Sequence, residues 1–220
     1  MDKMDPRLGQ QKNYPRAMNF YVLTIYEMVL ESKPAKILEI GTRNGQSTKT
    51  MLMALGKLGK GKLVSIDIKD RTDILQDDYP DLYQYWHMIA GNSHDPEIIQ
   101  SASDAIDGEM YDMILIDGDH SYEGSKQDFV EYTKFLKPGG IVILHDTVNH
   151  NEGVHRTWAE IDWPEKFNFD WGLGRAHDNL IVGLGITKKP LEEFGVIETV
   201  LAPITKEDLE GTPLEEVHGE

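Results

Sequence analysis

Two short segments of the sequence combine carboxylates and imidazoles directly after an apolar run. Asp117-Gly-Asp-His120 follows Met113-Ile-Leu-Ile116, and His145-Asp146-Thr147 follows Ile141-Val-Ile-Leu144. A carboxylate at the end of such a run needs water, a partner or a metal ion. Two oxygen ligands and an imidazole suit Mg²⁺, Mn²⁺ or Zn²⁺, and because the chain has no cysteine, a hard octahedral ion is favoured. The imidazole of His120 could also take a proton from a substrate hydroxyl.

A glycine-bearing turn, Glu39-Ile-Gly41-Thr-Arg-Asn-Gly45, offers a second kind of chemistry. Glycines let the backbone approach a ligand closely. A dinucleotide site would have a third glycine near the pyrophosphate, whereas the acid Glu39 suits a cationic amino-acid ligand. Asp67 ends the next apolar run, 22 residues after Gly45, where a carboxylate can accept both hydroxyls of a ribose. The pattern favours a nucleoside site, although a plain strand-to-helix turn would also contain such glycines.

The elements that position these residues follow from the periodicity of apolar side chains. Strands are expected at 36–41, 62–67, 87–90, 110–117, 141–145, 167–171 and 180–186, with a turn at 137–140, and helices at 14–31, 47–58, 95–106, 121–136 and 152–162. Alternating strands and helices predict an α/β fold with a doubly wound, mostly parallel seven-stranded sheet in a single domain. Right-handed crossovers place the strand ends along one edge, so both groups of residues should face one cleft.

Composition limits the cellular role. The chain has 22 basic and 38 acidic residues and a formal charge of −16, which disfavours a nucleic-acid partner. No apolar run approaches the ~20 residues of a membrane span, and Met1 to Lys12 is polar, so we expect a cytoplasmic protein without a membrane partner. We divide the chain into an N-terminal helical segment (1–34), a central domain (35–187) and an acidic appendage (188–220). A strand at 195–201 in the appendage is compatible with a homo-oligomer.

Three segments carry a resemblance to a known family: Ile116-Asp-Gly-Asp-His-Ser-Tyr-Glu-Gly124, Leu136-Lys-Pro-Gly-Gly140 and Leu144-His-Asp-Thr147. With the Glu39–Gly45 turn, they resemble the class I S-adenosylmethionine-dependent methyltransferases, in the family that includes cephalosporin-hydroxylase-like proteins and macrolide-sugar O-methyltransferases. The resemblance covers residues 36–187 and implies a Rossmann-like methyltransferase fold. The first turn is shared by the whole superfamily, whereas the block from 116 to 124 is more specific.

The resemblance implies an enzyme that transfers a methyl group from S-adenosylmethionine to a small-molecule acceptor. The cofactor-binding residues it implies are Glu39, Gly41, Thr42, Gly45, Ser47, Asp67, Asn92, Ser93 and Asp117. His120 and Asp117 would be catalytic, and a divalent ion such as Mg²⁺ would be held by Asp117, His145 and Asp146. Relatives more often have a carboxylate or an amide at the position of His145, so the histidine favours a softer metal. Asn92 and Ser93 would serve equally well as a helix cap before Asp95-Pro96.

Several functions stay open on sequence alone. The acceptor of an O-methyltransferase would be a hydroxylated small molecule, of the sugar or polyphenol type, with Trp171–Asp178 as a candidate lid. A nicotinamide-dependent oxidoreductase would share Asp67 but would leave the pair Asp117 and Asp146 unexplained. A hydroxylase-like iron enzyme could use His120, His145 and Asp146. A non-catalytic protein could keep the cofactor site alone.

Overall fold

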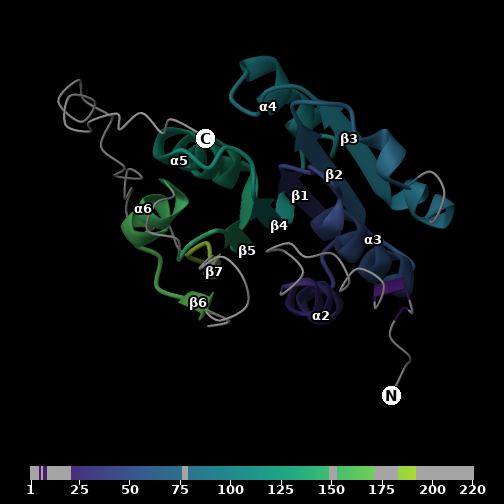
Figure 1. The fold of residues 1–220 in the computed structure, drawn as a ribbon, viewed down its shortest axis with the longest axis horizontal. Helices are drawn as coiled ribbons and strands as arrows, with labels where there is room; N and C mark the ends of the chain where they lie inside the picture. The colour runs from purple at the N-terminus through teal and green to yellow at the C-terminus, as the bar shows by residue number, and fades with distance from the viewer. Residues whose placement is uncertain are drawn as a thin grey trace, which may run out of the picture.

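The computed structural model describes residues 5, 7–8, 21–75, 79–148, 153–170 and 183–191. These residues form a seven-stranded sheet in the order β3-β2-β1-β4-β5-β7-β6 (Figure 1). The strands are β1 (Lys36–Ile40), β2 (Lys62–Asp67), β3 (Trp86–Ala90), β4 (Tyr111–Ile116), β5 (Leu136–His145), β6 (Lys166–Asp170) and β7 (Gly183–Lys188). Strands β1 to β5 pair in parallel, whereas β7 is antiparallel to both β5 and β6. The predicted mostly parallel, doubly wound sheet is confirmed.

The strand order reverses between β1 and β4. The chain moves outward from β1 through β2 to β3, then returns to place β4 on the other side of β1. In open α/β sheets, ligands bind where the order reverses, at the carboxyl ends of the strands. Both candidate groups of residues therefore follow strands on either side of this point.

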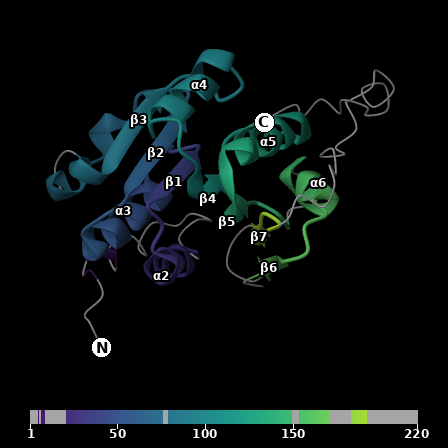
Figure 2. The ribbon, with the colours of Figure 1, turned by 180° about the vertical axis from the view of Figure 1, so that it is seen from behind.

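Helices cover both faces of the sheet (Figure 1), and Figure 2 shows the same layers from behind. The α-helices are α2 (Val22–Ser32), α3 (Gln46–Leu58), α4 (Pro96–Asp104), α5 (Tyr122–Tyr132) and α6 (Gly153–Glu160), with 3₁₀ helices at Thr72–Leu75, Pro80–Tyr85 and Thr133–Phe135. Among the described residues, no helix is long and apolar enough to cross a membrane.

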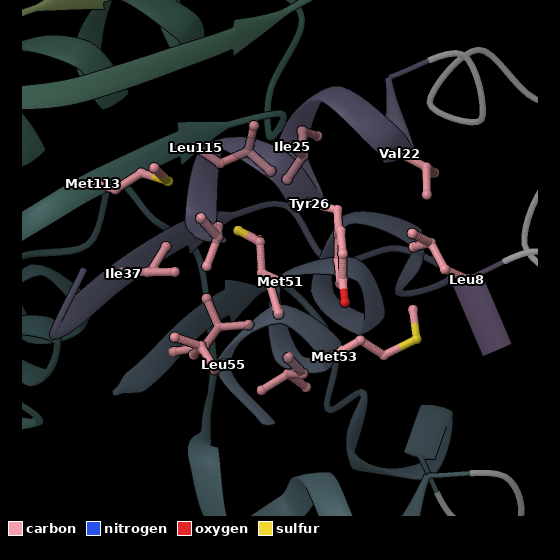
Figure 3. Close-up of a cluster of buried hydrophobic side chains, with 14 of the residues drawn as sticks. Leu8, Val22, Ile25, Tyr26, Ile37, Met51, Met53, Leu55, Met113 and Leu115 are labelled. Atoms are coloured by element: carbon pink, nitrogen blue, oxygen red, sulfur yellow. The ribbon is translucent and has the colours of Figure 1, made fainter. Parts of the chain in front are cut away.

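The first half of the core lies between the sheet and helices α2 and α3 (Figure 3). Alternate residues of a strand point to opposite faces, so Ile37 of β1 and Met113 of β4 face this layer. They pack against Ile25 of α2 and against Met51 and Leu55 of α3, and all five side chains are fully buried. Helix α2, the described part of the helix predicted at 14–31, thus shares a core with the sheet, and residues 14–20 lie outside the described residues. The domain boundaries at 34 and 187 stay predictions.

The second half of the core uses the other strand residues. Leu38, Ile40 and Ile114 face helices α4 to α6 and join Phe129 of α5 and Trp158 of α6. A parallel strand buried on both faces has a near-continuous apolar sequence, which is the pattern of Met113–Ile116 in β4 and, apart from Glu39, of Ile37–Ile40 in β1. The sheet is therefore rigidly packed up to the strand ends, where the polar residues begin.

The turn predicted at 137–140 is instead a bulge inside β5. Tyr111 pairs with Leu136 and Met113 pairs with Ile141, so five steps along β5 oppose two along β4. The backbone of the bulge is hydrogen-bonded to a later segment of the chain: the N–H of Gly139 donates to the carbonyl of Lys189 at 2.8 Å. The α-helix predicted at 121–136 ends earlier, at Tyr132, and a separate 3₁₀ helix, Thr133–Phe135, follows it directly. The predicted strand at 195–201 lies outside the described residues.

Candidate active site

A cleft of about 500 Å³ opens at the carboxyl edge of the sheet. Residues at the ends of four neighbouring strands line it. They include Gly41 and Arg43 after β1; Asp67, Ile68 and Arg71 at the end of β2; Gly91, Asn92, Ser93 and His94 after β3; and Asp117, Gly118, Asp119 and His120 after β4. Asp67 and two of the acid–imidazole residues, Asp117 and His120, therefore share one cleft, whereas His145 and Asp146 are not among the residues that line it.

Gly41 brings β1 and β4 close together at the floor of this cleft. Its φ is +89°, and a Cβ at this position would lie 2.0 Å from the carbonyl oxygen of Asp117. The N–H of Gly41 donates to Ile66 O at 2.8 Å, and the N–H of Asp117 donates to Ile40 O at 2.8 Å. A side chain here would clash with the backbone of β4, in addition to its strained φ. The glycine is needed for the geometry of the cleft itself.

Asp67 ends β2 with both carboxylate oxygens engaged. Oδ2 accepts from the N–H groups of Thr42 (3.1 Å) and Arg43 (2.8 Å), whereas Oδ1 accepts from the N–H of Lys69 (3.0 Å) and from Nε of Arg71 (3.2 Å). Burial acts to raise the pKa of Asp67, but these donors and the charge of Arg71 outweigh it and lower that pKa. An ionised carboxylate is thus fixed at the cleft wall before any ligand binds.

Glu39 lies beneath the cleft rather than in its wall. The side chain is fully buried, and it accepts hydroxyl hydrogen bonds from Ser47 (2.5 Å), Thr48 (2.7 Å) and Ser65 (2.6 Å). Burial raises the pKa of Glu39 to about 7 in spite of these three donors. The geometry gives Glu39 a supporting position under the first turn.

The other residues predicted from the first turn are likewise behind the cleft surface. Thr42, Gly45 and Ser47 are absent from its lining, and Thr42 and Ser47 are buried. Gly45 has a φ of +73°, and a Cβ there would lie 2.3 Å from Cδ1 of Ile74, so the Ile74 side chain would have to move. Of the turn, Gly41 and Arg43 reach the cleft, and Thr42 contributes its N–H to Asp67.

The loop after β3 contributes Asn92 and Ser93 to the cleft, together with His94. The Asn92 side chain accepts from the N–H of His94 at 3.2 Å, and the Ser93 carbonyl accepts from the hydroxyl of Tyr132 at 2.8 Å. Helix α4 has Asp95 as its N-cap, without a side-chain capping bond. Asn92 therefore stabilises its own turn, and both residues line the cleft.

The acid–imidazole residues form one compact centre. His120 lies between two carboxylates, with Nε2 3.4 Å from Oδ1 of Asp117 and Nδ1 3.2 Å from Oδ2 of Asp146. His145 approaches the same two carboxylates from the buried side, with Nδ1 3.1 Å from Oδ1 of Asp117 and 3.2 Å from Oδ1 of Asp146. The structure thus brings all four predicted residues into mutual contact.

The charges in this centre depend on one another. Burial acts to lower the pKa of His145, but the charges of Asp117 and Asp146 outweigh it and raise that pKa to about 10. Burial likewise acts to raise the pKa of Asp117, but His145 and His120 hold it below its usual range. Neither nitrogen of His145 has the angular geometry of a hydrogen bond among the described residues. The centre is held by charge more than by directed hydrogen bonds.

Asp146 adopts a left-handed backbone conformation, with a φ of +63°. Asparagine and aspartate tolerate this region better than other non-glycine residues, but it is still strained. The residue directly follows β5, so the left-handed turn redirects the chain at the edge of the sheet. Strain of this kind is concentrated at functional sites, and here it falls on one of the two converging carboxylates.

His120 is placed by the start of α5 without capping it. Ser121 is the N-cap, and its side chain accepts from the N–H of Gly124 at 3.0 Å. The backbone carbonyl of His120 accepts from the N–H of Gly153, the first residue of α6, at 3.0 Å. A Cβ at Gly153 would lie 1.9 Å from the backbone nitrogen of Tyr122, so the two helix starts are in direct contact.

The donor set fits a divalent cation. One ligand atom each from Asp117, His120 and Asp146 lies within 4.8 Å of the others. The imidazole in this set is His120, whereas the sequence predicted His145, which faces both carboxylates from the core. Two carboxylates and one imidazole are ligands that Mg²⁺, Mn²⁺ and iron accept.

Sequence reasoning missed several residues of the cleft, among them Arg43, Ile68, Arg71 and His94. Ile68 is 74% exposed directly after Asp67, and an apolar side chain at a strand end was an available signal. The lid predicted at Trp171–Asp178 lies outside the described residues. Tyr21 packs in the core, with its ring edge-on to His145 at a centroid distance of 5.8 Å.

Several solved structures of methyltransferases share this fold. The O-methyltransferase from Bacillus cereus, in complex with SAH, has a TM-score of 0.64 and 18% identity, covering 86% of this chain and 93% of that one. The O-methyltransferase TomG from Streptomyces achromogenes, in complex with SAM, has a TM-score of 0.63 and 16% identity, covering 86% and 91%. MycE, solved with Mg and SAH, has a TM-score of 0.56 and 14% identity, covering 87% and 57%. At these identities the likeness is one of fold.

Sequence comparison gives a short match and a long one. The uncharacterized protein y4gI of Sinorhizobium fredii is 37% identical over 62 residues, which is 27% of this chain and 7% of that protein's length. A family model described as a methyltransferase domain matches residues 38–147. This match spans half of the chain and includes the turn after β1, Asp67 and both acid–imidazole segments. The chain therefore belongs to the methyltransferase-domain family.

Proposed function

We propose that this methyltransferase uses S-adenosylmethionine to methylate a hydroxyl group of a small molecule. The observation that carries the proposal is the shared cleft, in which the ionised Asp67 lines one cavity with Asp117 and His120 at the strand ends. Asp146 and His145 contact these two residues. Relatives of the same fold were solved with SAM or SAH, which supports the choice of cofactor.

The cofactor would lie across the ends of β1, β2 and β3. Asp67 is already ionised and fixed at the end of β2, and it would accept the ribose hydroxyls in exchange for donors that it now holds, such as Nε of Arg71. The close approach of Gly41 to β4 would admit the amino-acid part, with Glu39 beneath the turn. Asn92 and Ser93 would line the position of the base. The cofactor supplies an activated methyl group, so the protein must align the acceptor and remove one proton.

His120 is the residue we assign to proton removal. It lines the cleft, and its two nitrogens lie near Asp117 and Asp146, which can stabilise the imidazolium formed when His120 accepts the proton. Asp117 reaches both the cleft and His120, so it would link cofactor binding to proton transfer.

A divalent ion, of which Mg²⁺ is the first candidate, would be held by Asp117, His120 and Asp146, because their ligand atoms form the compact set. Such an ion would fix the acceptor oxygens and lower the pKa of a bound hydroxyl. His145 would then neutralise the carboxylates from the core. MycE, solved with Mg and SAH, supports testing this ion first. If His120 is a ligand, proton removal passes to another base.

The acceptor class is a hydroxylated small molecule of the sugar or polyphenol type. A centre of two carboxylates and two imidazoles suits vicinal hydroxyls, which can bind a cation and give up a proton. A cytoplasmic location and a homo-oligomeric state are further proposals from the sequence.

Isothermal titration of the purified chain with SAH, SAM and NAD tests the cofactor. Binding of SAH without binding of NAD supports the proposal, whereas binding of NAD alone would overturn it. A panel of sugars and catechols, with release of SAH as the readout and with or without Mg²⁺, then tests the acceptor. Oxygen uptake with Fe²⁺ but no release of SAH would instead indicate a hydroxylase-like enzyme.

A further inference from the structure

Strand β6 forms one end of the sheet and pairs with β7 alone among the described strands (Figure 1). On this inner edge the N–H of Lys188 donates to the carbonyl of Glu165 at 3.3 Å. Backbone groups alternate in direction along an antiparallel strand, so Lys166, Asn168 and Asp170 direct their N–H and C=O groups outward. An edge of this kind can pair with a further strand.

Two phenylalanines add an apolar surface to this edge. Phe167 is 60% exposed and Phe169 is 40% exposed, and both lie on the same face of β6. The residues opposite them in β7, Ile186 and Leu184, belong to the core on that face or pack against it. The apolar layer of the sheet therefore continues to its end, and an exposed aromatic pair on a strand edge marks a surface for association.

Lys166 lies on the other face of β6 and is already oriented. Its ammonium donates to the carbonyls of Trp158 and Ile161 at the end of α6. An ammonium has three donors, so one is left for another acceptor. Burial lowers the pKa of Lys166, and the charge of Asp162 offsets this only in part. A further carboxylate beside this ammonium would therefore be stabilising.

The sequence of β6, Lys166-Phe-Asn-Phe-Asp170, is complementary to itself in the antiparallel direction. Pairing centred on Asn168 places Lys166 of each copy opposite Asp170 of the other, and Phe167 opposite Phe169. Opposite charges and aromatic pairs at facing positions stabilise a sheet. Moving the centre by one residue would place Asn168 opposite Lys166 or opposite Asp170, and both ion pairs would be lost.

We propose that β6 is the interface of a two-fold dimer, in which it pairs with β6 of a second copy of this chain, antiparallel and centred on Asn168. The outward backbone groups of Asn168 then bond to those of the second Asn168, and the two sheets continue through the interface. Phe167 and Phe169 form the non-hydrogen-bonded pairs, in which side chains approach most closely. This interface differs from the segment 195–201, and it does not depend on the proposed function.

Sedimentation velocity of the full chain at about 1 to 300 µM tests the dimer. A five-residue strand pair is small for a specific interface, so we expect a dissociation constant of about 1–100 µM. A wild-type protein that stays monomeric over the whole range would overturn the inference.

Two charge variants test the register. Lys166→Glu places two carboxylates opposite each other in its own dimer, and Asp170→Lys places two ammonium groups opposite each other. Each variant alone should dimerise about tenfold or more weakly than the wild type, because two attractive pairs become repulsive. An equimolar mixture restores both ion pairs, so its heterodimer should return to within about threefold of the wild-type affinity. A mixture no better than the separate variants would contradict the register.

Phe167→Ser tests the apolar contact and should also weaken the dimer by about tenfold or more. Leu191→Ser is the matched control, because Leu191 is 79% exposed but lies outside β6. It should dimerise like the wild type, and an equal loss in both variants would mean unspecific apolar association. Far-UV circular dichroism checks the fold of each variant. If Lys166→Glu does not fold, Asp170→Lys and Phe167→Ser still decide the inference, since a dimer unaffected by both would use another surface.

Discussion

The two sides of the cleft bury carboxylates in different ways. On the β1–β2 side, Glu39 and Asp67 are satisfied mainly by hydroxyl and backbone N–H donors at 2.5 to 3.1 Å. On the β4–β5 side, Asp117 and Asp146 face two imidazoles at 3.1 to 3.4 Å, and several of these buried polar atoms lack hydrogen-bond geometry. We call the first, which is fully hydrogen-bonded, the binding side of the proposed site, and the second, which is held mainly by charge, the exchangeable side.

The difference matches the two tasks of a transferase. Binding a cofactor benefits from donors and acceptors that are fixed in advance, because little order is then lost on association. Moving a proton or taking up a cation requires groups whose partners and protonation can change. The backbone strain at Asp146 lies on the exchangeable side.

The largest expected effect comes from adding a side chain at Gly41, which lies against the backbone of Asp117 between the two sides. Gly41→Ala would place a Cβ 2.0 Å from Asp117 O at a positive φ, so we expect a loss of about 3 kcal/mol or more in the free energy of unfolding. Gly108→Ala is the control, because Gly108 also has a positive φ but nothing lies within 4 Å of its added Cβ. Urea unfolding measures both; equal losses would mean that the close approach of β1 and β4 is unimportant.

Removing the imidazole of His120 should reduce the rate of methyl transfer more than it reduces the affinity for SAH. His120→Gln should lower the rate of methyl transfer by about 10²–10⁴-fold, the range for loss of a general base. The affinity for SAH should change by less than about threefold, because Asp67 keeps its donors. His155→Gln on α6, outside the cleft lining, is the control and should keep the wild-type rate. A turnover loss matched by lost SAH affinity would contradict this separation.

Metal titration distinguishes the two histidines. If a divalent ion binds, His120→Gln should weaken Mn²⁺ binding by about tenfold or more, as Asp117→Asn and Asp146→Asn should. His145→Gln should weaken it less, because His145 approaches from the buried side. Electron paramagnetic resonance of free Mn²⁺ gives each affinity, with Asp112→Asn at the opposite edge of the sheet as a control. A greater loss in His145→Gln would restore the ligand set expected from the sequence.

Glu39, on the binding side, should make the free energy of unfolding depend on pH. The pKa of Glu39 is raised from 4.5 to about 7, so the folded state holds its proton where the unfolded state has lost it. Wild-type stability should therefore fall, relative to Glu39→Gln, as the pH rises from 4.5 to about 7, by up to about 3 kcal/mol. Thermal or urea unfolding across this range measures the difference.

Asp67→Asn gives the opposite sign and serves as the internal comparison. Because the pKa of Asp67 is lowered, the wild type gains stability over this variant above the ordinary value of 3.8 and loses it as the pH falls. If the stability of the wild type relative to each variant changed in the same direction with pH, the hydrogen bonding described for one of the two carboxylates would be wrong.

The smallest expected effect is at Arg71, which reinforces a carboxylate that already has three backbone donors. Arg71→Gln should change the affinity for SAH by no more than about threefold, because a partly exposed ion pair contributes little. Titration calorimetry at low and moderate salt checks this. A loss beyond about tenfold would mean that Arg71 itself contacts the ligand.

Much of the site could be predicted because its residues directly follow predicted strands. Asp67, Asp117 and Asp146 each end an apolar run, and the parallel sheet then brings them to one edge. The choice between His120 and His145 could not be predicted, because it depends on which side of the carboxylates each ring approaches. The contact between Asp128 and His94 joins a helix face to a distant loop, and no local pattern indicates it.

The bulge in β5 was missed for a similar reason. Residues 137–140 contain Pro-Gly-Gly, which is typical of a turn, but Gly139 and Gly140 exchange hydrogen bonds with Lys189. Only the position of a segment much later in the chain makes this stretch part of the sheet. The local sequence thus predicted the helices and strands and the residues at their ends. The bulge depends on contacts between distant segments, which the local sequence does not indicate.

The hydrogen bond from the N–H of Gly153 to the carbonyl of His120 fixes the main-chain position from which the His120 imidazole extends. Its main chain is clamped where two helices begin, so the ring can swing about its own side-chain torsions but cannot travel with a moving loop. If His120 is the base proposed above, the reach of its side chain limits how far from the sheet edge the acceptor hydroxyl could lie.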